Sequence, residues 1–168
     1  IGCMNKLKTK KRIDYYLYDL EETINIGRKF FLGFKHKHLK VNFINKLSEV
    51  KNFDIVYFGS SLQYFSDYKS ILLAVISKNP RYIFLTDTFM VKNHSTYATA
   101  QVNMPGKKTA YWIFKFDDIV SFFSENNYSL IYVSSNFQPF HNFDNFPDEN
   151  KVTDSSNLLF KKNFSSIF

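Results

Sequence analysis

Cysteine, arginine and long apolar runs are all scarce in this chain of 168 residues. Its single cysteine, Cys3, cannot form an internal disulfide, and no charged-then-apolar signal segment opens the sequence. We therefore expect a reducing, cytoplasmic setting and no metal site built on cysteines. Charged and amide residues interrupt the apolar stretches well before the roughly 20 residues that a membrane-spanning helix needs, so we expect no membrane partner.

The scarcity of arginine bears on the net charge of +7, because only Arg12, Arg28 and Arg81 accompany the many lysines. Arginine offers the planar two-pronged donor that favours base and phosphate recognition, whereas lysine is a point charge. The joint enrichment in Lys, Asn, Phe, Tyr and Ile is also what A/T-rich codons would produce. We therefore predict no specific nucleic-acid partner, with salt-sensitive nucleic-acid binding as the alternative.

Apolar residues are abundant, at 45% of the chain with 20 Phe and 11 Tyr, which is too apolar for a disordered protein. We expect a single domain over residues 1–168, burying roughly 70% of the surface that the unfolded chain exposes. Phe137, Phe140, Phe143 and Phe146 recur every three residues in an irregular segment. We expect them to anchor that segment on the core, the alternative being a patch for a partner.

Short apolar segments alternate with helical patterns along most of the chain. Glu21 and Glu22 favour the start of a helix, and Gly33 is placed as its stop signal. Ser66 or Asp67 can cap the next helix. We predict strands over residues 13–18, 41–44, 54–58, 82–85, 130–133 and 157–161, helices over residues 4–11, 21–31, 67–78 and 117–126, and a polar loop over residues 90–109.

This alternation predicts an α/β fold with a doubly wound, mostly parallel sheet. The segments 41–44 and 54–58 are apolar enough to be strands buried on both faces. The last two strands, 130–133 and 157–161, are joined without a helix, so we expect them to be antiparallel at one edge of the sheet. An antiparallel edge separates this layout from an ordinary dinucleotide-binding fold.

Two groups of residues follow predicted strands, where open α/β sheets bind ligands. The first runs from Gly59 to Tyr64 in a small-residue bend. The second is Asp19, seventeen positions after Gly2 and so close to the roughly twenty-residue gap between a glycine-rich turn and the carboxylate that holds a ribose. Asp19 has an alternative role as a cap of the following helix.

A series of short motifs in this order and spacing resembles a poorly characterised bacterial family of S-adenosylmethionine-dependent methyltransferases of the class I, Rossmann-like kind. The similarity runs from about residue 13 to residue 135, and residues 158–162 match the closing strand of the family. The motifs are Tyr18-Asp19-Leu20 with Gly27-Arg28, Phe53-Asp54-Ile55-Val56 running into Ser61-Leu62-Gln63-Tyr64, Tyr82-Ile83-Phe84 to Asp87-Thr88, Gln101-Val102-Asn103, and Tyr111-Trp112-Ile113-Phe114.

The resemblance implies S-adenosylmethionine as cofactor. Asp19 would hold its ribose, and Asn45 lies near the usual adenine-contacting region. The bend residues Gly59, Ser60 and Ser61 would approach its methionine or adenosyl portion. The first strand and most of the glycine-rich loop of the family would precede residue 1, leaving Gly2 as their remnant. The expected fold is therefore truncated at the N-terminus, and the chain is either a fragment or a protein that has lost methyl transfer.

A methyl group on a sulfonium is already activated, so the protein needs only to align the acceptor and, where required, to remove a proton. Asp87 after a predicted strand and His94 in the predicted loop are the candidate bases. Each has a plainer alternative, because Asp87 could cap a turn and His94 could be a solvated surface residue. His36 and His38 have lysines around them and no nearby carboxylate or thiol, so we read a solvated turn and no metal site.

Two lines of reasoning predict the residues that bind the methyl acceptor. The resemblance places Gln63 and Tyr64 at the transfer site, and the polar and aromatic groups of Gln101, Asn103 and Tyr111 are of the kind that recognise sugars. Tyr111, with its neighbour Trp112, could instead be a core residue. We predict methyl transfer to a small polar or carbohydrate-type acceptor, the alternative being a degenerate, non-catalytic binding module. Pairing with another chain is open, since a missing strand would leave a gap in the sheet.

Overall fold

The computed structural model describes residues 11–104, 106–137 and 142–163, which divide into two compact units. Unit 1 covers residues 1–51 and unit 2 covers residues 52–168, and each is described by itself below. Gly2 and most of the helix expected over residues 4–11 lie outside the described residues. No helix in the described parts of the chain is long and apolar enough to cross a membrane.

Unit 1 is a strand–helix–strand unit made of β1 (Ile13–Tyr18), α1 (Glu21–Phe30) and β2 (Leu39–Ile44), followed by a 3₁₀ turn at Leu47–Glu49. The two strands pair in parallel along their whole length. α1 carries acidic residues in its first turn and basic residues in its last, as the helix dipole favours. Gly27 allows a close approach, because a Cβ there would lie 2.5 Å from a ring carbon of Phe43.

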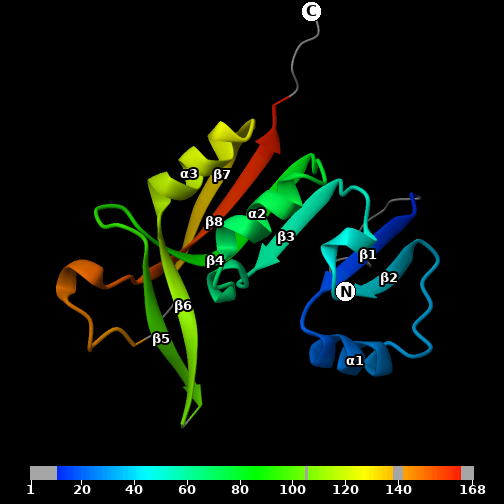
Figure 1. Ribbon diagram of the computed structural model, residues 1–168, viewed down its shortest axis with the longest axis horizontal. Coiled ribbons are helices and arrows are strands. Elements are labelled where there is room, and N and C mark those ends of the chain that lie inside the picture. The colour runs from blue at the N-terminus through cyan, green and yellow to red at the C-terminus, as the bar shows by residue number, and fades with distance from the viewer. Residues whose placement is uncertain (1–10, 105, 138–141, 164–168) are drawn as a thin grey trace, which may run out of the picture. The chain divides into compact units, whose positions relative to one another are not determined.

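Unit 2 is built on a six-stranded sheet (Figure 1). Its strands are β3 (Ile55–Gly59), β4 (Tyr82–Val91), β5 (Tyr97–Met104), β6 (Lys107–Lys115), β7 (Tyr128–Phe137) and β8 (Asp154–Lys162). The order is β5-β6-β4-β8-β7, with β3 paired to β4 in parallel. β7 and β8 are antiparallel and β7 lies at the edge, which confirms the expected antiparallel edge. The α/β class is likewise confirmed.

The two helices of unit 2 follow the predicted pattern. α2 (Tyr68–Ile76) begins after Asp67, whose carboxylate accepts a hydrogen bond from the Ser70 amide at 3.0 Å. Hydrogen bonds from Ser70 hold the pKa of the Asp67 carboxyl below its ordinary value. α3 (Phe116–Glu125) packs the ring of Phe123 on that of Phe160 in β8, with centroids 4.0 Å apart. The first contact caps α2, and the second fixes α3 on the sheet.

Two expectations about the strands are wrong. The strand predicted over residues 82–85 continues to Val91, and much of the loop predicted over residues 90–109 is a hairpin formed by β5 and β6. β6 also pairs in parallel with the end of β4, so long-range pairing overrides the polar composition of the segment. Gly106, with φ of +77°, provides the backbone conformation that the hairpin turn requires.

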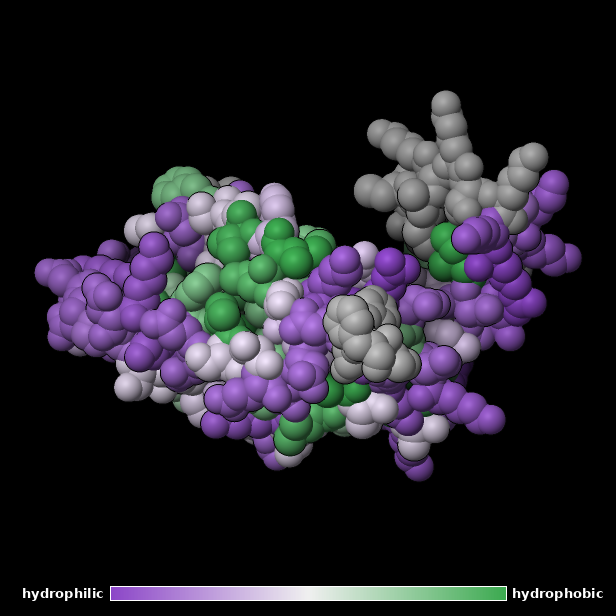
Figure 2. All heavy atoms as spheres, turned by 90° about the horizontal axis from the view of Figure 1, so that it is seen from above, coloured by the Kyte–Doolittle hydropathy of each residue, from purple (hydrophilic) through white to green (hydrophobic). Residues whose placement is uncertain are grey.

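The two faces of strand β3 are not equally buried, contrary to expectation. In β3, Phe58 is buried while Ile55 and Tyr57 are exposed, so this strand is buried on one face and the expectation of burial on both is wrong. Figure 2 shows hydrophobic patches between hydrophilic ones on the face that it draws. Phe143 and Phe146 pack against a buried cluster that includes Phe89, as expected. The expectation is wrong for Phe137, which is exposed at the end of β7, and Phe140 lies outside the described residues.

Candidate functional site

The bend after β3 has an unusual backbone. Ser60 has a φ of +49°, a left-handed conformation that costs a non-glycine residue roughly 1–2 kcal/mol. Its amide donates a hydrogen bond to the carbonyl of Thr86 in β4, at 3.0 Å. The 3₁₀ turn Leu62–Tyr64 follows directly. The bend is thus tied to the neighbouring parallel strand, and the next turn lies beyond the carboxyl end of β3, beside the middle of β4.

Gln63 is the centre of this region, with 0% of its surface exposed. Its Nε2 donates to Ser60 Oγ at 3.0 Å and to the carbonyl oxygen of Asp87 at 3.4 Å. Its Oε1 is also buried and has no hydrogen-bond partner among the described residues. Buried amide oxygens are almost always bonded, so this acceptor is one to which an added donor could bind.

Asp87 lies inside β4 rather than at the end of a strand, which corrects its predicted position. It has a φ of +49° and sits where the pairing of β4 with β8 slips between Leu85 and Thr88. Such a bulge turns a side chain out of the regular pleat. The backbone amide of Asp87 donates a hydrogen bond to Asn157 Oδ1 at 3.0 Å. The carboxylate oxygen Asp87 Oδ1 accepts a hydrogen bond from Ser155 Oγ at 3.3 Å. Asp87 is therefore held by residues of the sheet.

The sequence analysis did not identify the residues of β7 and β8 that form hydrogen bonds with Asp87. Asn136 Nδ2 also lies 3.5 Å from Asp87 Oδ1, and Asn157 Nδ2 donates to Ser134 Oγ at 3.1 Å. Both strands carry the triplet Ser-Ser-Asn, at residues 134–136 and 155–157, and the two triplets face each other in the antiparallel register. A polar triplet inside each of two apolar strands was the signal that could have identified them.

The hairpin adds two further predicted residues to this region. Tyr64 donates its hydroxyl hydrogen to Gln101 Oε1 at 2.9 Å, and its ring meets that of Tyr111 edge-on with centroids 5.2 Å apart. Tyr111 is 5% exposed, and burial is the main cause that raises the pKa of its hydroxyl above the ordinary value. The aromatic contact and the burial show that Tyr111 packs between the β5–β6 hairpin and the bend from Gly59 to Tyr64.

Two predicted residues are not joined to this group. His94 lies half-buried in the connection between β4 and β5, and none of the described hydrogen bonds links it to the bend. Asn103 belongs to β5, but its side chain is not among those described. Trp112 makes an edge contact with the Tyr68 ring of α2, at 5.6 Å, as a packing residue would.

In unit 1, Asp19 and Asn45 follow β1 and β2 directly. Asp19 is exposed, and its Oδ1 accepts a hydrogen bond from the Leu20 amide at 2.7 Å. Leu20 itself is the N-cap residue of α1, so Asp19 does not cap the helix in the usual way. Asn45 donates to Glu21. Because these residues and the bend belong to different units, their mutual proximity stays a prediction.

The structure resembles solved methyltransferases over most of its length. A S-adenosylmethionine-dependent methyltransferase from Methanosarcina mazei matches with a TM-score of 0.60 and 9% identity, over 90% of this chain and 83% of that one. Magnesium protoporphyrin IX methyltransferase from Synechocystis, with bound S-adenosylhomocysteine, matches with a TM-score of 0.57 and 12% identity, over 88% and 64%. No family model and no curated protein sequence matches the chain.

Another similar structure, described as a pericyclic reaction enzyme, has a TM-score of 0.56 and 10% identity, over 96% of this chain and 40% of its own. At such low sequence identities the structural similarity establishes the fold, whereas the reaction has to be inferred from the residues of the site. The chain has the Rossmann-like fold of class I S-adenosylmethionine-dependent methyltransferases, as the resemblance of its motifs implied. It spans less than two thirds of the Synechocystis enzyme and of the pericyclic one.

Proposed function

We propose that this chain binds S-adenosylmethionine and transfers its methyl group to a small polar or carbohydrate-type acceptor. The observation that carries the proposal is the buried side chain of Gln63, which joins Ser60 to Asp87 and keeps an unbonded acceptor beyond the carboxyl end of β3. An unbonded buried acceptor costs about 1–3 kcal/mol, which a purely structural amide would avoid. Its place on this fold is where ligands bind.

The residues present fit the cofactor. The exposed carboxylate of Asp19 would accept hydrogen bonds from the ribose hydroxyls, and Asn45 would contact the adenine region. Ser60 and Ser61 would face the methionine portion, beside Gly59. Gly2 lies outside the described residues, and its role in a glycine-rich loop stays a prediction. The bound cofactor would supply an activated methyl group on a sulfonium, which leaves alignment and proton removal to the side chains of this chain.

The acceptor would lie between the bend and the hairpin. The hydroxyls of Tyr64 and Tyr111 and the amides of Gln63, Gln101 and Asn103 can exchange hydrogen bonds with a polyol. This mixture of flat rings and amides favours a small polar acceptor.

Asp87 would take the proton of an acceptor hydroxyl, since Ser155 and Asn136 orient its carboxylate. His94 is the second candidate base, carried by a connection that could bring it to the bend.

A second candidate function is a binding module without catalysis. The observation that favours it is the ring of Tyr57, which lies over the bend: a Cβ added to Gly59 would be 2.6 Å from a Tyr57 ring carbon. The Tyr57 hydroxyl also accepts a hydrogen bond from Thr86 Oγ1 at 3.0 Å, which holds the ring there. An aromatic ring in this place narrows the room for a cofactor.

Calorimetric titration with S-adenosylmethionine and S-adenosylhomocysteine tests both readings. We expect binding that Asp19→Asn weakens by about tenfold, because a neutral amide loses the charge-assisted hydrogen bonds to the ribose. Asp14→Asn is the matched control, since Asp14 is also an exposed carboxylate of unit 1, and among the ion pairs of the described residues it pairs with Arg12 at 3.1 Å.

Three outcomes separate the candidates. Failure of both ligands to bind would refute the methyltransferase proposal. Binding without methyl transfer to any of a panel of sugars and small polyols would favour the binding module. Equal effects of Asp19→Asn and Asp14→Asn would remove Asp19 from the cofactor site.

A further inference from the structure

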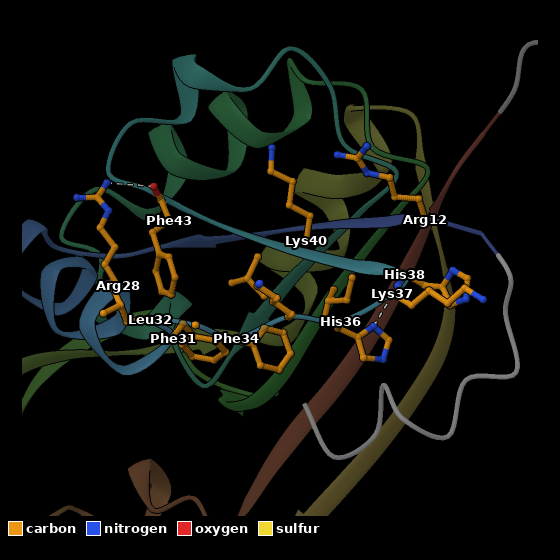
Figure 3. A pocket seen from close by; sticks show the side chains of 14 residues that line it. Arg12, Arg28, Phe31, Leu32, Phe34, His36, Lys37, His38, Lys40 and Phe43 are labelled. Carbon is orange, nitrogen blue, oxygen red and sulfur yellow. Dashed lines mark hydrogen bonds between the residues drawn. The ribbon is translucent and has the colours of Figure 1, made fainter.

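A second candidate site lies wholly within unit 1. Arg12 before β1, residues along β2 from Leu39 to Phe43, the end of α1 and the segment from Phe31 to His38 surround a hollow of about 650 Å³ (Figure 3). This volume falls within the range of sites for small molecules, about 300–1,000 Å³. None of the residues proposed to bind the cofactor lines it.

The hollow stands apart from the proposed cofactor residues of the same unit. Arg12 and His38 lie at the amino ends of the paired strands, whereas Asp19 and Asn45 follow the carboxyl ends. A strand of six residues separates the two ends by roughly 17 Å, at about 3.3 Å per residue. Phe43 near the carboxyl end of β2 also lines the hollow, so the part of the hollow beside Arg12 and His38 is the part that lies this far from Asp19 and Asn45.

One wall of the hollow is aromatic. Phe31 meets Phe34 edge-on at 5.4 Å and Phe43 at 5.6 Å between ring centroids. The ring of His36 is nearly parallel to that of Phe34, with centroids 6.5 Å apart and an interplanar angle of 6°. Figure 3 shows Phe31, Phe34 and His36 gathered beside one another. These rings form an apolar surface on which a planar or apolar group can rest.

The charge of the lining is of one sign. Five lysine or arginine residues and two histidines line the hollow, and no Asp or Glu does. Arg12 pairs with Asp14 at 3.1 Å and Arg28 with Glu21 at 3.9 Å, but Lys35, Lys37 and Lys40 form no ion pair within the described residues.

The uncompensated positive charge would attract an anion. Figure 3 shows Lys40 extending away from Phe31 and Phe34, so the cations next to the rings in sequence, Lys35 and Lys37, are the ones to test.

We propose that this hollow binds a phosphate ester whose ring or apolar portion rests on the phenyl rings of Phe31 and Phe34. Lys35 and Lys37 pair with the phosphate oxygens, and His36 stacks beside the bound group. The proposal is independent of methyl transfer. Two sources share this chemistry: a free nucleotide-like molecule and a lipid headgroup. The second would draw on Phe30 and Leu32, which are 84% and 87% exposed.

The test is a titration of the full chain with uridine diphosphate, in buffer holding saturating S-adenosylhomocysteine so that a cofactor site cannot account for the heat. We expect binding that weakens with added salt and at least about tenfold in the variant Lys35→Ala/Lys37→Ala, because two charge-assisted contacts are lost. The control Lys69→Ala/Lys92→Ala removes two exposed lysines of unit 2 and should bind as the parent does.

Two further experiments test the contact with the Phe34 ring and show whether the ligand is a free molecule or a lipid headgroup. Phe34→Ala should weaken uridine diphosphate but leave inorganic pyrophosphate unchanged. Flotation with phosphatidylglycerol vesicles, against phosphatidylcholine alone, tests the lipid source in the same two lysine variants. Lysine-dependent binding to either probe supports the proposal. It is overturned if neither probe binds, or if the control variant loses as much affinity as Lys35→Ala/Lys37→Ala. Titration of S-adenosylhomocysteine by itself reports separately on the proposed function.

Discussion

Replacement of Gln63 by leucine gives the sharpest test of the site in unit 2. Leucine has a similar size and no polar atom, so the change removes the hydrogen bonds of Nε2 to Ser60 at 3.0 Å and to the Asp87 carbonyl at 3.4 Å. Two neutral hydrogen bonds contribute about 1–3 kcal/mol together. The same change removes the buried, unbonded Oε1, which costs about 1–3 kcal/mol in the folded protein.

These two effects oppose each other, so we expect the free energy of unfolding of Gln63→Leu to stay within about 1.5 kcal/mol of the parent. Activity should respond differently, because the change removes the amide that joins Ser60 to Asp87 and that we propose contacts the acceptor. A fall of at least about tenfold in kcat/KM corresponds to one lost contact of roughly 1.4 kcal/mol in the transition state. Urea denaturation measures the first quantity, and methyl-transfer kinetics measure the second.

The control is Gln63→Glu, which keeps a side chain of the same shape and loses the Nε2 donor. We expect it to be less stable than Gln63→Leu, because a carboxylate would then be buried beside the Asp87 carbonyl. A loss of more than about 3 kcal/mol in Gln63→Leu would mean that Oε1 is bonded in solution and that Gln63 is structural. Unchanged stability with unchanged kinetics would remove Gln63 from the transfer site.

Three further predictions concern single side chains. Tyr64→Phe, which deletes the hydrogen bond to Gln101, should raise KM for the acceptor and leave cofactor affinity unchanged by calorimetry; a change in cofactor affinity alone would contradict the assignment. Phe160→Ala should lower the free energy of unfolding by about 3–5 kcal/mol in urea, because the stacked ring of Phe123 then faces a cavity, and a loss below about 1 kcal/mol would show that this contact is not part of the core. Asp67→Ala should destabilise the protein at pH values above the pKa of the carboxyl in the unfolded chain, and much less at acid pH. The reason is that the folded-state pKa of Asp67 is lowered, so the stabilisation by its carboxylate is lost as the pH falls through that folded-state pKa. Equal destabilisation at pH 7 and pH 3 would refute the role of Asp67 as a helix cap.

Much of the local structure could be predicted because it depends on neighbours in the sequence. The spacing of apolar residues and the caps indicated α1, α2 and α3, and the bounds differ from the expected ones by only a few residues. The bend from Gly59 to Tyr64 was recognisable because small residues follow an apolar strand. The prediction of antiparallel β7 and β8 succeeded for a related reason, since no helix separates them.

The hairpin of β5 and β6 could not be predicted in this way. Its residues are polar and its strands lack strict apolar alternation, so composition favours a loop. The pairing of Met90 with Phe114 continues the sheet and supplies hydrogen-bond partners for the segment. Strand formation there depends on partners more than on intrinsic propensity. As a result, Gln101 was expected in a loop and Tyr111 outside the predicted strands, whereas both lie on paired strands.

The sequence alone determined the three helices and the small-residue bend that ends β3, because periodicity, capping and turn chemistry act over a few residues. Only the tertiary structure decided what surrounds those ends. The contact between the Asp87 amide and Asn157 joins residues 70 positions apart, and the burial of Gln63 follows from the packing of the bend on β4. Such contacts form when distant strands share one sheet, and no local pattern of residues records that pairing.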